Sequence, residues 1–150
     1  MSEINFVFSV KDPQFTTKTT VVDNSSNNYI SHAFVRCPIY SNSNSSYKQI
    51  GYKVSDDYVQ QVAPNKYVVR LNNTYTFHKN NKTIGTISWQ YVFENNKPEI
   101  YYPVNVVASS TIISGTGKYK GATGSVYLLP KPNGKRLVKI KLDNNCSFSC

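Results

Sequence analysis

The sequence predicts an all-β fold, an eight-stranded antiparallel up-and-down barrel with minimal helix. Three observations predict it. Aromatic residues make up 13% of the 150 residues and include twelve tyrosines, and tyrosine and threonine favour pleated, half-buried strands over helices. Short segments of alternating polarity recur, separated by turns rich in asparagine, proline or glycine. No segment has the apolar periodicity of a long amphipathic helix.

The first half of the chain supplies three predicted strands and one long connection. The connection contains a short edge strand near Val21, and the third strand is expected to break near Asp56 and Asp57, because acidic residues are poor strand formers. In chain order the strand, connection, strand, loop and strand are residues 4–10, 14–28, 29–40, 41–46 and 47–61.

Residues 67–78 and 83–93 form the clearest predicted hairpin. Both segments alternate, and Asn80 and Asn81 between them tolerate the positive φ angles of a tight turn. After this hairpin we expect a strand over 100–113 interrupted at Pro103, a glycine-rich bend, a strand over 126–129, a turn at Asn133-Gly134 and a last strand over 136–142. On one face of the hairpin the alternation gathers Val69, Leu71, Asn73, Tyr75 and Phe77 with Ile87, Trp89, Tyr91 and Phe93.

Four of the seven glycines lie between Gly115 and Gly124, in a stretch flanked by strand-like segments. A Walker-type phosphate loop is excluded, because Ile112 and Tyr119 stand where its first glycine and its Ser or Thr belong. Glycines in such a stretch permit sharp coiling and close backbone approach. We therefore assign a backbone-shaping role to Gly115, Gly117, Gly121 and Gly124.

The stretch 114–126 is similar, glycine for glycine, to the signature of the allene oxide cyclase and dirigent barrels. Segments 34–40, 73–77 and 85–88, together with Gly51, resemble other strands of that family, so the resemblance covers about the whole chain. The resemblance implies an eight-stranded antiparallel barrel of the calycin type and assembly as a homotrimer.

The acids of that family are not retained at the positions that match. Its paired acids before the strand-two proline fall on Arg36 and Cys37, and its first-strand His-Asp pair falls on Ser9 and Val10. The segment 3–5 (Glu-Ile-Asn) matches a cyclase motif in letters alone. We therefore expect neither a working cyclase nor a working dirigent protein, and we assign no catalytic residue, no metal site and no cofactor.

The net charge, the composition and the first residues limit which partners and which compartment we expect for this protein. The net charge is +9, from fourteen lysines and three arginines against eight acids, but the lysines are scattered, so nucleic acid is a weakly supported partner. Lysine and asparagine richness suits an A/T-rich genome such as that of a large DNA virus. No apolar run is long enough to span a membrane, and Glu3 near the start argues against a classical secretion signal, so we expect a cytoplasmic or virion protein.

One β-barrel domain is expected over residues 1–142, followed by a short tail over 143–150 that holds Cys146 and Cys150. The aromatic stripe suits either core packing or a pocket for one small hydrophobic ligand. The first hypothesis is a non-catalytic binding or structural barrel; the alternatives are an isomerase- or cyclase-like enzyme and a basic accessory protein that binds nucleic acid. The candidate ligand-binding residues are Arg36, Arg70, Tyr75, Phe77, Trp89 and Tyr91.

Overall fold

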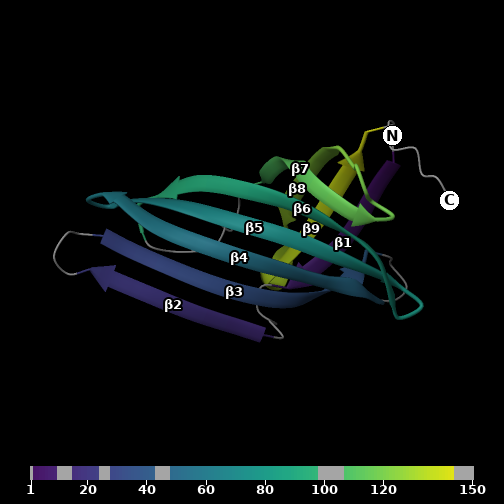
Figure 1. The fold of residues 1–150 in the computed structure, drawn as a ribbon, viewed down its shortest axis with the longest axis horizontal. Coiled ribbons are helices and arrows are strands. Elements are labelled where there is room, and N and C mark those ends of the chain that lie inside the picture. Colours follow the sequence, from purple (N-terminus) through teal and green to yellow (C-terminus); the bar gives the residue numbers. More distant parts are fainter. Residues whose placement is uncertain (1, 10–14, 24–27, 43–47, 98–106, 144–150) are drawn as a thin grey trace.

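The described residues form nine antiparallel strands and one short 3-10 turn (Figure 1). The computed structural model describes residues 2–9, 15–23, 28–42, 48–97 and 107–143. The predicted interruption at Pro103 and the tail cysteines Cys146 and Cys150 lie outside these residues. The elements are β1 (Ser2–Ser9), β2 (Phe15–Asp23), β3 (Asn28–Ser41), β4 (Gln49–Ala63), β5 (Lys66–Lys79), β6 (Lys82–Asn95), β7 (Ala108–Gly117), β8 (Gly124–Pro130), the 3-10 turn (Pro132–Gly134) and β9 (Lys135–Leu142).

Eight of the nine strands close into the predicted barrel. They follow the order β1-β9-β8-β7-β6-β5-β4-β3, and β1 pairs with β3 to complete the ring. Among the described residues the closure is narrow, because there it involves only the pairs Phe6–Ser41 and Val7–Tyr40. The ninth strand, β2, pairs with β3 outside the ring and is the edge strand expected near Val21, although it is nine residues long.

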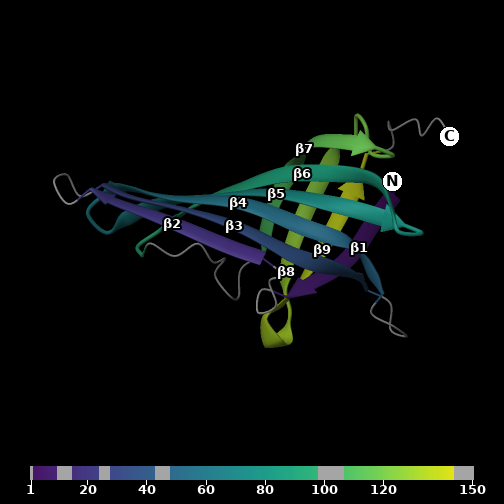
Figure 2. The same ribbon diagram turned by 60° about the horizontal axis from the view of Figure 1, so that its bottom comes forward.

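Four long strands extend well beyond the ring. Strands β3 to β6 have 14 or 15 residues, whereas β1 and β7 to β9 have 7 to 10. Figure 2 shows β1, β8 and β9 crossing the long strands at one end, while the long strands run on with β2 toward the other. Along one edge of β3 the partner strand changes from β1, which pairs at Tyr40, to β2, which pairs at Arg36. The molecule is therefore a closed barrel continued by an extended sheet.

Alternating side chains give the long sheet an inner and an outer face. On β5 and β6 the predicted inner positions are buried, including Leu71, Tyr75, Phe77, Ile87 and Trp89. The core is completed by apolar side chains from the short strands, among them Phe6, Phe8, Val126, Leu128, Val138 and Ile140. On the outer face, polar side chains pair across strands: Thr74 with Ser88 at 2.9 Å, Gln90 with Asn72 at 2.7 Å and Thr86 with Thr116 at 2.7 Å.

The predicted break near Asp56 and Asp57 is wrong. Strand β4 runs without interruption through both residues and pairs with both neighbours there. Each carboxylate finds a side-chain partner on its own face, Ser55 for Asp57 and His32 for Asp56, so neither acid remains an unpaired group that would disrupt the strand. These tertiary partners override the low strand propensity of aspartate.

The two tight turns follow the predicted chemistry. In the β5–β6 turn Asn80 and Asn81 have φ angles of 51° and 60°, and in the β8–β9 turn Asn133 and Gly134 have φ angles of 62° and 72°. The glycine-rich bend begins later than predicted, because β7 continues through Gly115 to Gly117. This continuation is possible because a Cβ at Gly115 would lie 2.1 Å from the backbone oxygen of Tyr119, and glycine has no Cβ.

Two positions, Gly121 and Gly124, require glycine for different reasons. Both have positive φ, but a Cβ at Gly124 would lie 2.0 Å from the backbone oxygen of Lys141, whereas a Cβ at Gly121 meets nothing within 4 Å. We expect Gly121→Ala to cost about 1–2 kcal/mol of unfolding free energy through strain alone. Gly124→Ala should cost a further 1–3 kcal/mol, roughly, because β8 must move away from β9.

Urea unfolding of both variants measures this difference. Equal losses of stability in Gly121→Ala and Gly124→Ala would contradict the close approach of β8 and β9 at Gly124.

Candidate binding site on the inner face of the barrel

A set of polar and aromatic side chains lies side by side on the inner face of β4, β5 and β6. Lys53 pairs in register with Tyr75, and Ser55 lies in the row that continues through Asn73 to Trp89. Asp57 occupies the next inner position of β4, because positions two apart in a strand share a face. We call the following five residues the inner cluster: Lys53, Ser55, Asp57, Tyr75 and Trp89.

The inner cluster begins where the ring closes and continues beyond it. Closure between β1 and β3 ends at Tyr40, whereas Lys53 pairs with Cys37 and Asp57 pairs with Ala33, further along the same strand. The amine of Lys53 lies 4.9 Å from the centre of the Phe8 ring, which projects from β1. Lys53 therefore sits at the end of the closed barrel, and Asp57 sits where the long strands run on alone.

Two ionisable side chains of the inner cluster are almost fully buried. Lys53 is 6% exposed and Asp57 is 5% exposed, and the Ser55 hydroxyl donates a hydrogen bond to Asp57. Within the described part of the chain, Lys53 has neither an ion pair within 4.0 Å nor a hydrogen bond. A buried charge without a partner is costly, so both groups are biased toward their neutral forms.

The pKa values of these groups change in the directions expected for a dry interior. Burial lowers the pKa of the Lys53 amine, and electrostatic interactions with Asp57 and Cys37 oppose that change only in part. Burial raises the pKa of the Asp57 carboxyl, against the smaller opposing effects of the Lys53 charge and the Ser55 hydrogen bond. The cluster thus combines an acid that tends to keep its proton with an amine that tends to lose one.

Tyr75 and Trp89 carry buried polar atoms whose bonding capacity is unused. Their exposed fractions are 0% and 1%, and neither the Tyr75 hydroxyl nor the Trp89 indole nitrogen has a hydrogen-bond partner among the described residues. The indole N–H lies toward the hydroxyl and lowers its pKa slightly, but burial dominates and raises the pKa of Tyr75. We treat the pair as unbonded, because its geometry falls short of a hydrogen bond. Two buried donors therefore have no acceptor.

Four of the six predicted ligand-binding residues lie on this inner face. Tyr75, Phe77 and Trp89 are buried in the core, and Tyr91 is half-buried beside Phe93, with ring centres 5.5 Å apart. The other two are exposed on the outer face: Arg36 lies 4.0 Å from the centre of the Tyr52 ring, and Arg70 pairs in register with Tyr58. The structure therefore does not bring the two arginines to the aromatic stripe.

Sequence reasoning missed Lys53, Ser55 and Asp57. The available signal was their spacing, since Lys-x-Ser-x-Asp in an uninterrupted strand places all three side chains on one face. The predicted break at Asp56 and Asp57 hid this signal.

Neither Cys37 nor the segment 3–5 forms a second candidate site within the described residues. Cys37 is buried, as expected, and Asn5 donates a 2.8 Å hydrogen bond to Glu3 in the exposed segment that resembles a cyclase motif. In the ranges described above, no group of three or more His, Cys, Asp or Glu side chains could hold a metal ion. No helix among those residues is long and apolar enough to cross a membrane.

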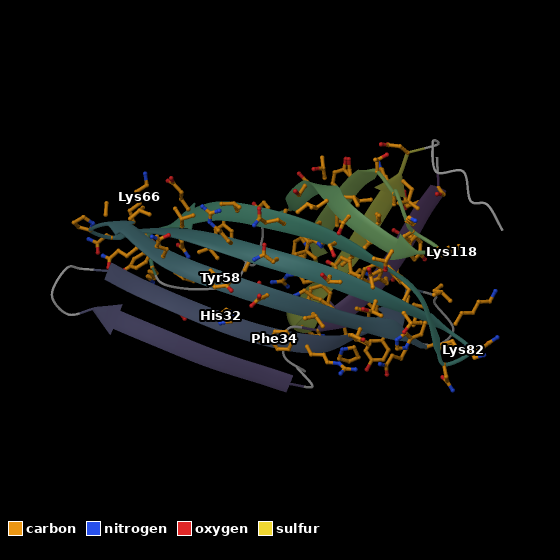
Figure 3. All side chains as sticks on the ribbon, viewed as in Figure 1. His32, Phe34, Tyr58, Lys66, Lys82 and Lys118 are labelled. Carbon is orange, nitrogen blue, oxygen red and sulfur yellow. The ribbon has the colours of Figure 1, made fainter. Side chains whose placement is uncertain are left out.

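A polar and aromatic group occupies the outer face of β3 and β4 (Figure 3). The rings of His32 and Tyr58 stack with their centres 4.5 Å apart, and the His32 ring nitrogen contacts the Asp56 carboxylate. Asn72 donates a 2.9 Å hydrogen bond to the backbone oxygen of Asp56. These groups are partnered with one another, in contrast to the donors of the inner cluster.

Comparisons with known proteins identify the fold. A pyocyanin demethylase matches with a TM-score of 0.62 and 13% identity, over 95% of this chain and 100% of its own. Two pterocarpan synthase dirigent proteins match with TM-scores of 0.55 and 0.53 and identities of 17% and 14%, over 94% of this chain and 84% and 92% of theirs. The chain has a dirigent-like barrel fold. No family model matches the sequence, and no curated protein matches it.

The raised pKa of Asp57 predicts a pH-dependent stability. A raised pKa means that the folded state holds the proton more tightly than the unfolded state, so this stability is present below the ordinary value of 3.8 and is lost as the pH rises through the raised value. Asp57→Asn, which is always neutral, should gain stability relative to the native protein as the pH rises above the ordinary value of 3.8 toward neutrality. A gain of about 1 kcal/mol moves the melting temperature by about 2–4 °C in a domain of this size.

Thermal melts of the native protein and Asp57→Asn across this range provide the measurement. Asp56→Asn is the matched control, because Asp56 is the next residue on β4 and lies on the opposite, half-exposed face. A melting-temperature difference that stays constant, or that shrinks with rising pH, would show that burial does not govern Asp57.

Proposed function

We propose that this protein is a binding barrel for one small hydrophobic molecule that carries an oxygen acceptor. The observation that supports it best is a pair of buried donors, Tyr75 and Trp89, that have no acceptor among the described residues and lie on the same inner face as the buried Lys53 amine. Buried donors normally have partners, and an unsatisfied one costs about 1–3 kcal/mol. A ligand that accepts hydrogen bonds from them would recover that free energy.

The surroundings of these donors define the chemistry of the ligand. The Phe8 ring and the half-buried Tyr91 and Phe93 supply apolar surface near the polar atoms. The Ser55 hydroxyl is already committed to Asp57, whereas the buried amide of Asn73, in the row between Ser55 and Trp89, presents an acceptor oxygen beside these donors. A flat apolar molecule with a carbonyl, hydroxyl or carboxylate oxygen fits this arrangement.

A proton-transfer enzyme is the second candidate, and one observation favours it. Asp57 is buried with a raised pKa, which is the condition under which a carboxyl acts as a general acid near neutral pH. The next acid on the strand, Asp56, lies on the opposite face with His32, so Asp57 has no adjacent second carboxyl on β4. Binding is therefore the simpler proposal, and turnover requires a substrate that reacts through this one acid.

Trp89 provides a direct measurement of binding, because it is the only tryptophan in the chain. We expect benzyl alcohol to change the Trp89 fluorescence in a saturable way, with toluene as the matched compound that lacks the oxygen. Lys53→Met should weaken binding of benzyl alcohol by about two- to tenfold, since a hydrogen bond from a neutral donor contributes about 0.5–1.5 kcal/mol. Binding of toluene should change much less.

Lys66→Met is the control variant, since Lys66 is exposed and pairs with Glu94 at 3.3 Å, away from the inner cluster. If Lys53→Met and Lys66→Met affect both compounds equally, the inner cluster is not the ligand site.

We further propose that the chain assembles as the homotrimer that its dirigent-like sequence signature implies. Tyr58, Arg70 and Val92 form one cross-strand row on the outer face, and Tyr58 and Val92 are 39% and 46% exposed. Exposed apolar side chains in one row suit contact with a second copy.

Sedimentation should give three times the 17.0 kDa mass of the chain, and Val92→Lys should shift it toward the monomer because a second cation then stands beside Arg70. Ile113→Lys is the control, since Ile113 is 64% exposed on β7. A native protein that sediments as a 17.0 kDa monomer at micromolar concentration contradicts the proposal.

A further inference from the structure

We propose that Lys53 forms a covalent imine with a small hydrophobic aldehyde or ketone bound inside the barrel. This inference rests on the proposed binding function and adds the reactive class of the ligand. It depends on the position of the Lys53 amine, which is buried at the end of the ring, faces the Phe8 ring, and has no ion pair within 4.0 Å in the described part of the chain.

An amine attacks a carbonyl only in its neutral form, and a lysine in an apolar environment favours that form. The Phe8 ring provides such an environment, and burial lowers the pKa of Lys53. The nearest acid along the inner face of β4 is Asp57, which is buried and accepts a hydrogen bond from Ser55. An amine that is not held in a salt bridge is free to react.

Imine formation also requires a proton donor for the departing water, and Asp57 can supply it. The Lys53 nitrogen forms a bond to the carbonyl carbon, and the carbonyl oxygen takes up one of the amine protons to give a carbinolamine. Asp57 then protonates the hydroxyl group, the carbon–oxygen bond breaks to release water, and the remaining nitrogen proton returns to the Asp57 carboxylate. The products are one imine and one water, with no change of oxidation state.

The unpartnered donors beside Lys53 complete the site. Tyr75 is the register neighbour of Lys53 on β5, and its buried hydroxyl has no hydrogen-bond partner among the described residues. A hydroxyl donated to the carbonyl oxygen polarises the carbon that the amine attacks. The inner cluster therefore provides a nucleophile, an acid and an oxygen-binding donor on two adjacent strands.

Reductive trapping with benzaldehyde tests this inference. Sodium cyanoborohydride converts an imine into a stable secondary amine, and peptide mass spectrometry then identifies the labelled lysine among the fourteen in the chain. We expect about tenfold more label on Lys53 than on any exposed lysine, because a buried neutral amine is the better nucleophile. Benzyl alcohol, which has no carbonyl, measures binding alone through Trp89.

Two variants distinguish chemistry from folding. Lys53→Arg keeps a positive charge but cannot form an imine, so the preferential label should vanish and the remaining label should be spread evenly over the exposed lysines. Asp57→Asn keeps the amine and removes the acid, so Lys53 should be labelled about 10²-fold more slowly. The second variant tests the mechanism even if the first one does not fold.

The outcomes separate this inference from the binding proposal. Preferential label on Lys53 that slows in Asp57→Asn supports the imine. Saturable binding of benzyl alcohol with no preferential label on Lys53 overturns the imine and leaves the binding proposal standing. No response of Trp89 to either compound, together with label spread evenly over the lysines, overturns both.

Discussion

The uninterrupted pairing of β4 is the constraint on which the rest of the inner face depends. Because β4 is paired on both sides through Asp56 and Asp57, Lys53, Ser55 and Asp57 all point inward and Asp56 points outward. A shift of one residue in this register would exchange the two faces and bury Asp56 and Tyr58 instead. The contact between His32 on β3 and Asp56 on β4 favours the observed register.

Burying Lys53 and Asp57 works against stability, and a core built for stability alone would avoid it. Each buried ion costs several kcal/mol, and apolar residues of similar size often fill such positions without loss. The same interior leaves the Tyr75 hydroxyl and the Trp89 indole without acceptors. Unfavourable groups gathered in one place are typical of functional sites rather than of structural cores. This argument, and not the fold, supports a binding role.

The fold itself is compatible with several activities. The chain shares its architecture with a pyocyanin demethylase and with two pterocarpan synthase dirigent proteins at identities of 13–17%. Proteins with different names on one barrel show that function is decided by the side chains the barrel encloses. Among the described residues those side chains include the Lys53 amine, the buried Asp57 carboxyl, the Asn73 amide and the Tyr75 and Trp89 donors, packed among aromatic rings.

The sequence by itself determined the strands, most of their faces and the turn chemistry. Alternation over β5 and β6 placed Tyr75, Phe77 and Trp89 inside, and Asn80 and Asn81 marked the turn between them, because both signals are local. Only the tertiary structure decided whether Asp56 and Asp57 interrupt β4, since the pairing of β4 with β3 and β5 brings His32 to Asp56 and buries Asp57 beside Ser55. It also separated Arg36 and Arg70 from the aromatic stripe and brought Lys53 against Phe8, because contacts between distant strands depend on register and closure, which local patterns do not encode.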